Sequence, residues 1–101
     1  MAYDSYASTS FFKLLRAMPK GIRRAARDQN RRFKSDNARP GLEFKQLCRV
    51  KDERLFSARV SDGYRVLGVP LLDESEPAIL WFWIGTHAEY DRKWRAFCYG
   101  R

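Results

Sequence analysis

The sequence predicts an α+β fold in which an N-terminal helical hairpin packs on a curved four-stranded antiparallel sheet. Three observations predict it. The first third of the chain has apolar residues at helical spacing, the remainder alternates short β-rich runs with polar turns, and no shift in composition divides the 101 residues. Because a chain of this length fits one domain, we expect residues 1–101 to form a single unit.

The N-terminal third contains an ambiguous segment followed by a strong helical pattern. Residues 1–9 are weakly patterned, which leaves a loose arm or a short edge strand open. Residues 10–34 predict the helical hairpin, since their apolar residues recur every three or four positions. Thr9 or Ser10 can cap the first helix, and Pro19 suits the first turn of the second.

The hairpin also concentrates the positive charge of the chain. Residues 13–34 hold nine basic residues and one acidic residue, so this segment accounts for the whole net charge of +8. Such a patch attracts polyanions and speeds encounter with them. A solvated basic face without a partner is the alternative. The predicted nucleic-acid-binding residues are Lys20, Arg23, Arg24, Arg27 and Arg31 on the hairpin and Lys45 on the sheet.

The sheet is expected within residues 42–85, because short turns join its β-rich runs into an antiparallel meander. The last run, AILWFWI, has no polar alternation, so we expect an interior strand that is buried on both faces. Residues 86–101 predict a short helix or an irregular tail. The expected strands are 42–50, 55–60, 64–72 and 78–84, and the expected turns are 51–54, the Asp62-Gly63 pair and 73–77.

Composition excludes several classes of protein. No apolar run approaches the ~20 residues of a membrane helix, and Lys13 and Arg16 interrupt the apolar patch that a signal peptide would need. We therefore expect a cytoplasmic protein. Cys48 and Cys98 have no C-x-x-C motif or second histidine beside them, so we predict two reduced thiols and no zinc or other metal site.

Polar residues on the strands, and just beyond the last one, can share an open face of the sheet. They are Lys45, Arg59, Arg65, His87 and Tyr90. Arginine binds phosphate with two hydrogen bonds, histidine exchanges protons near neutral pH, and tyrosine donates a hydrogen bond or stacks on a base. Together these groups favour metal-independent RNA cleavage by attack of the ribose 2′-OH on the neighbouring phosphorus.

Each of these residues also has a simpler interpretation. His87 could be a surface or capping residue, and Tyr90 could pack against the sheet. Arg65 could form a salt bridge with Asp62. An acidic neighbour of His87, Glu89 or Asp91, could be solvated or could hold the imidazole in place. Alternation along the strands does not show which face of the sheet is open.

Two motifs, in this order, resemble the RelE/ParE superfamily of bacterial toxins from toxin–antitoxin pairs. They are GYRV at 63–66 and IGTHAEY at 84–90, and the loop NARPGLEFK at 37–45 strengthens the likeness, which covers roughly residues 10–94. The resemblance implies a compact toxin that a cognate antitoxin neutralises. It also implies a ribosome-dependent mRNA endonuclease that needs no cofactor, whose partners are mRNA on the ribosome and the surrounding rRNA.

The resemblance also implies roles for single residues. Arg65 would contact the scissile phosphate, while His87 and Tyr90 would supply acid–base and stacking roles. Glu43 is the nearest equivalent of a glutamate that serves as base in some members. Phe56 and Ala58 stand where some nucleases carry a lysine pair, which favours a mechanism centred on histidine.

The same superfamily contains toxins that inhibit DNA gyrase, so a ParE-like gyrase inhibitor is the main alternative. A non-catalytic nucleic-acid-binding relative is another. In a gyrase inhibitor, exposed Trp94 and Phe97 could anchor a protein partner. The alternative for both rings is packing against the sheet.

Overall fold

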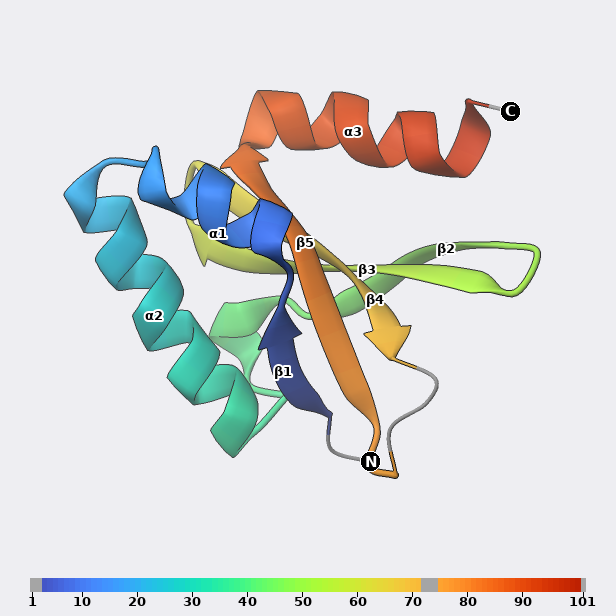
Figure 1. Ribbon diagram of the computed structural model, residues 1–101, viewed down its shortest axis with the longest axis horizontal. Coiled ribbons are helices and arrows are strands. Elements are labelled where there is room, and N and C mark those ends of the chain that lie inside the picture. The colour runs from blue at the N-terminus through green and yellow to red at the C-terminus, as the bar shows by residue number, and fades with distance from the viewer. Residues whose placement is uncertain (1–2, 72–74, 101) are drawn as a thin grey trace.

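The computed structural model describes residues 3–71 and 75–100, and it places two helices on one face of a sheet and a third on the other (Figure 1). The predicted α+β class is confirmed. The four-stranded antiparallel sheet is wrong, because five strands form a mixed sheet in the order β1-β5-β4-β3-β2. The elements are β1 (Asp4–Ala7), α1 (Thr9–Arg16), α2 (Lys20–Ser35), the 3₁₀ turn η1 (Pro40–Leu42), β2 (Lys45–Val50), β3 (Glu53–Ser61), β4 (Tyr64–Leu71), β5 (Ala78–Thr86) and α3 (His87–Tyr99).

Strand β1 is the element that makes the sheet mixed. It pairs in parallel with β5, whereas β2 to β5 form the antiparallel meander that the sequence predicts. The main-chain N–H of Asp4 donates to the carbonyl of Pro77 at 2.8 Å, and that of Ser8 donates to Trp81 at 3.0 Å. Buried Ser5 accepts a hydrogen bond from the Trp81 indole at 2.9 Å. The ambiguous first segment is therefore an edge strand.

Helices α1 and α2 do not form the packed hairpin that the sequence predicts. They diverge from the connection at Pro19, and each packs on the sheet, α1 against β5 and α2 against β3 (Figure 1). Phe11 and Phe33, the buried residues of the two helices, belong to one core cluster with Trp81. The N-cap of α1 is Ser8, whose hydroxyl accepts from the Phe11 N–H at 3.1 Å, one residue before the predicted cap. No helix within the described ranges is long and apolar enough to cross a membrane.

The sheet separates two apolar clusters. The cluster under α1 and α2 contains Phe11, Phe33, Phe56, Trp81 and Ile84 among its buried residues. The cluster under α3 is built on Leu55, Leu67 and Tyr90, with Phe82 and Trp83 packed against it. Strand β5 contributes to both clusters, so the prediction of an interior strand covered on both faces is confirmed.

The turns follow the prediction in place but not in every detail. β3 and β4 are joined at Asp62-Gly63, yet no described glycine has a positive φ. The non-glycine residues with positive φ are Glu43 at 47° and Lys51 at 56°. Residues 42–44 precede β2 instead of starting it. The predicted acidic turn at 73–77 lies partly outside the described residues.

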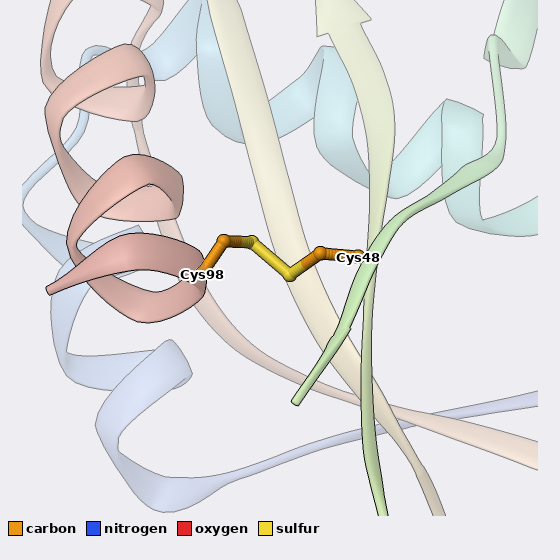
Figure 2. Close-up of a disulfide and its surroundings, with 2 residues drawn as sticks. All are labelled: Cys48 and Cys98. Atoms are coloured by element: carbon orange, nitrogen blue, oxygen red, sulfur yellow. A yellow bond between two sulfur atoms is a disulfide. The ribbon is translucent and has the colours of Figure 1, made fainter. Parts of the chain in front are cut away.

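The C-terminal segment forms helix α3, and a disulfide ties it to the sheet. Cys98 near the end of α3 is bonded to Cys48 on the edge strand β2, with Cα atoms 6.1 Å apart (Figure 2). The prediction of two reduced thiols is therefore wrong. It rested on the general rarity of disulfides in cytosolic proteins, and a separation of 50 residues gave no sign that the fold brings the two elements together.

Candidate active site

A cavity of about 240 Å³ opens on the α3 side of the sheet. It lies where the first turns of α3 face the strands β2, β3 and β4. Five of the residues that the sequence selected line it, namely Arg65, His87, Tyr90, Glu43 and Lys45. The remaining lining residues are Leu47, Ser57, Asp91 and Trp94.

Arg65 projects from β4 onto this face because it shares the alternation of Leu67 and Val69, which pack in the α3 cluster. The open face, which alternation alone left undecided, is the α3 face. A guanidinium nitrogen of Arg65 donates to the carbonyls of Ser61 at 2.6 Å and Tyr64 at 3.0 Å. Arg65 has no ion pair with a carboxylate in the part of the chain that the structure describes, so its charge is available to an anion.

His87 is fixed at the start of α3. Its main-chain N–H donates to the Gly63 carbonyl at 2.8 Å, which ties the helix to the β3–β4 turn. The imidazole lies edge-on to Tyr90, with ring centroids 5.5 Å apart. Its Nδ1 is 3.4 Å from a carboxylate oxygen of Asp91. The backbone thus holds the ring beside the strand that carries Arg65.

Tyr90 forms the floor of the cavity. Its side chain is buried, and its hydroxyl donates to the buried Ser57 hydroxyl at 3.2 Å. The ring packs with Leu55 and Leu67 in the α3 cluster. Little of the ring remains free to stack on a base, whereas the hydroxyl lies on the cavity wall.

Arg59 differs from Arg65 in its partners. Its guanidinium forms an ion pair with Asp62 and a second one with Glu43 at 3.6 Å. Arg59 does not line the cavity and reaches it through Glu43. Since two carboxylates surround the Arg59 guanidinium, Arg65 and Lys45 are the cations better placed to hold a phosphate. The considered salt bridge between Arg65 and Asp62 is absent, because Asp62 pairs with Arg59.

Helix α2, which carries most of the basic residues, lies on the other side of the sheet from α3 (Figure 1), whose first turns line this cavity. Lys20, Arg24, Arg27 and Arg31 are exposed, and Arg31 pairs with Asp28. Half-buried Arg23 donates to the Met18 carbonyl at 2.8 Å. The predicted nucleic-acid-binding residues therefore occupy two faces, with Lys45 alone beside the cavity.

A larger cavity, of about 580 Å³, lies between the sheet and the helices α1 and α2. Its walls are mainly apolar, with Phe11, Leu15 and Phe33 among them, and Arg16 and Arg27 also line it. It contains no histidine or carboxylate. It can hold an apolar side chain or ligand, but it lacks the groups for proton transfer.

Comparison with known proteins supports the architecture. The sequence matches no protein-family model and no curated protein. The structure is similar to a chain of the archaeal RelE–RelB complex from Pyrococcus horikoshii OT3, with a TM-score of 0.57 and 23% sequence identity, over 79% of this chain and 91% of that chain. This chain has the RelE fold. The resemblance that the motifs indicated is thereby confirmed at the level of the fold.

Within this RelE fold, three site residues escaped sequence reasoning. Ser57 was not selected at all, Trp94 was considered only as an exposed anchor for a protein partner, and Asp91 was named only as one possible neighbour of His87. A signal for Asp91 was present: Thr86 caps α3 in a reciprocal capping box with Glu89. That motif starts the helix at His87 and places Asp91 one turn later on the same side.

The other acidic neighbour, Glu89, belongs to the cap and not to the cavity. Its carboxylate accepts hydrogen bonds from the Thr86 N–H and hydroxyl, both at 2.9 Å. These bonds, with a smaller contribution from nearby Arg92, lower the pKa of Glu89 and outweigh the opposing effect of desolvation. Glu89 is therefore an ionised structural group at the start of the RelE-fold helix that carries His87.

Proposed function

We propose that this protein is the toxin of a type II toxin–antitoxin pair and cleaves mRNA on the ribosome. The observation that carries the proposal is the cavity that holds the imidazole of His87 together with the Arg65 guanidinium, which has no ion pair among the described residues. This combination supplies charge stabilisation and proton exchange to the same phosphodiester. The RelE fold supports the proposal, since the similar structure is a RelE–RelB complex.

The reaction uses only side chains of the cavity. Arg65 and Lys45 bind the non-bridging oxygens of the scissile phosphate. The ribose 2′-OH loses its proton, its oxygen forms a bond to phosphorus, and the bond from phosphorus to the 5′-oxygen breaks. His87 and Glu43 exchange the two protons, one removed from the 2′-OH and one delivered to the leaving 5′-oxygen. The products carry a 2′,3′-cyclic phosphate and a 5′-hydroxyl.

The two faces of the sheet suit two RNA contacts. The exposed basic residues of α2, with Arg24 and Arg27 at their centre, would dock on rRNA, while the cavity on the opposite face takes the mRNA. Docking and cleavage are then separate functions of separate elements. The proposed place of action is the cytoplasm, where translation occurs, and the proposed protein partner is an antitoxin.

The test is to add the purified protein to translating ribosomes and to map mRNA 5′ ends. We expect new 5′-hydroxyl ends with the wild-type protein. Arg65→Ala and His87→Ala should each lose cleavage by about 10²–10³-fold, because each removes a group that acts in the transition state. Arg49→Ala is the matched control, since the exposed Arg49 side chain donates to the Lys51 carbonyl and does not line the cavity.

The thermal unfolding of each variant separates a lost reaction from a lost fold. Full-rate cleavage by a folded Arg65→Ala or His87→Ala protein contradicts the assigned roles. Intact mRNA together with inhibition of DNA gyrase contradicts the nuclease proposal and supports the ParE-like alternative. The structure offers that alternative little support, because Trp94 and Phe97 pack against the α3 cluster instead of standing exposed.

A further inference from the structure

Asp91 lines the cavity but takes no part in the proposed reaction. It lies four residues after His87 in α3, on the same side of the helix. Its Oδ2 is 3.4 Å from His87 Nδ1. Catalytic contacts of this kind are often long before substrate binds and tighten in the complex. Asp91 thus faces one particular nitrogen of the imidazole.

The Asp91 carboxylate is itself held from a second side. Its other oxygen accepts a hydrogen bond from the Trp94 indole N–H at 3.4 Å. The Trp94 ring is flanked by the Arg95 guanidinium, 5.0 Å from the ring centroid, and by the edge of Tyr99 at 6.1 Å. Trp94 therefore limits the rotation of the carboxylate, and Asp91 lies about one helical turn from both His87 and Trp94.

The exposed imidazole is located by its backbone and by one ring contact. Its backbone is tied to Gly63, and its ring contacts Tyr90. A carboxylate beside Nδ1 can accept a hydrogen bond when that nitrogen carries the proton, and the partner of one ring nitrogen determines which of the two is protonated. The lone pair of the neutral ring is then on Nε2.

We propose that Asp91, held by Trp94, is the positioning residue that keeps the proton of neutral His87 on Nδ1. Nε2 is then the nitrogen that exchanges a proton with RNA, whether it removes the 2′-OH proton or, once protonated, delivers one to the 5′-oxygen. The effect of Asp91 on the cleavage rate rests on the proposed nuclease function. The tautomer itself is independent of any substrate.

The tautomer can be measured directly because the chain contains one histidine. ¹⁵N NMR of the full-length protein, recorded at a pH at which the imidazole is neutral, reports which ring nitrogen carries the proton. We expect the Nδ1–H form in the wild type. Asp91→Ala should shift the ring toward Nε2–H, and Trp94→Phe should do so to a smaller degree. Lys93→Ala, an exposed neighbour in α3 that does not line the cavity, should not change it.

Cleavage kinetics give the second readout. Asp91→Asn should lower kcat by about 10–100-fold with KM unchanged, the range that is seen when the partner that orients a metal-bound histidine is lost. Asp91→Glu should recover part of kcat. An Nε2–H wild type, or an Asp91→Asn protein with wild-type kcat, overturns the assignment. A wild type that cleaves no RNA overturns the proposed function instead, and the tautomer of Asp91→Ala then decides alone whether Asp91 positions the ring.

Discussion

Gly85 shows how the absence of a side chain permits close packing near the end of β5. A Cβ at this position would overlap the indole ring of Trp83 and approach Oε1 of Glu89 at 3.1 Å. In the sheet, Gly85 is paired with Arg65, two residues before His87. Because Gly85 has no side chain, the Trp83 indole can lie against the backbone of Gly85, just before α3 begins beside the cavity.

We expect Gly85→Ala to destabilise the protein by about 1–3 kcal/mol, which is typical of overpacking. Displacement of Glu89 should also disturb the start of α3. Urea denaturation measures the first effect, and loss of amide protection at His87 measures the second. Gly63→Ala is the control, because its φ is not positive and nothing lies within 4 Å of the added methyl. A Gly85→Ala protein as stable as Gly63→Ala would contradict this account.

At the scale of the element, the pH dependence of α3 follows from its capping box. The hydrogen bonds from Thr86 lower the pKa of Glu89 below its ordinary value of 4.5. A carboxyl whose pKa is lowered by folding stabilises the fold above its unfolded pKa, and this contribution is lost as the pH falls through the folded pKa.

We therefore expect the wild type to unfold at a higher temperature than Glu89→Gln at neutral pH. The difference should shrink as the pH falls below about 4.5 and through the lower folded pKa. Thermal unfolding from pH 7 to 3 measures it. Thr86→Val, which removes the capping hydroxyl, should reduce the pH dependence as well. A constant difference between wild type and Glu89→Gln across this range would show that ionisation of Glu89 does not stabilise α3.

The elements predicted well are those with local signals. The apolar run 78–84 predicted the interior strand β5, and the Asp62-Gly63 pair predicted the β3–β4 turn. β1 was left undecided between an edge strand and a loose arm, because four residues that pair in parallel with a strand more than 70 positions away leave little local pattern. The divergence of α1 and α2 was missed for a related reason: their apolar residues could have faced each other as well as the sheet.

The same limit applies to the candidate site. Arg65 and His87 lie on neighbouring elements, and the motifs around them indicated that they meet. Ser57 could not be predicted as a site residue because its contact in the site is with the hydroxyl of Tyr90, which is 33 residues away in the chain. Arg59 was grouped with Arg65 because both flank the same turn, and the ion pairs that separate their roles depend on the position of Glu43. Contacts between residues that are far apart in the chain leave no local pattern from which a single sequence could predict them.

At the scale of the whole molecule, the Cys48–Cys98 disulfide closes the sheet against α3 (Figure 2). The cross-link spans 50 residues, a loop for which the chain-entropy relation gives about 4 kcal/mol. The paired Cys48→Ser and Cys98→Ser variant should therefore be less stable by about 2–4 kcal/mol in urea denaturation. Dithiothreitol should destabilise the wild type to a similar degree and leave the variant unchanged. Equal stability with and without reductant would mean that the cross-link does not support the fold.

Net charge is also a property of the whole molecule, since the full excess of +8 lies in residues 13–34, on the side of the sheet away from the cavity. If α2 docks on rRNA, ribosome binding should weaken steeply with salt, because each phosphate contact releases a counterion. Arg24→Glu with Arg27→Glu should weaken binding and reduce the slope of log K against log salt by roughly 1.4–1.8.

The matched control for this prediction is Arg49→Glu with Lys51→Glu, which changes the charge equally at the β2–β3 hairpin. Cleavage at saturating ribosome concentration should survive the α2 changes, because the cavity groups stay in place on the other face of the sheet. If the two pairs of substitutions weaken binding equally, net charge governs the interaction and α2 is not a docking surface. If the α2 pair also removes cleavage at saturation, docking and chemistry are not separable, and the division of the molecule into two RNA-contacting faces is wrong.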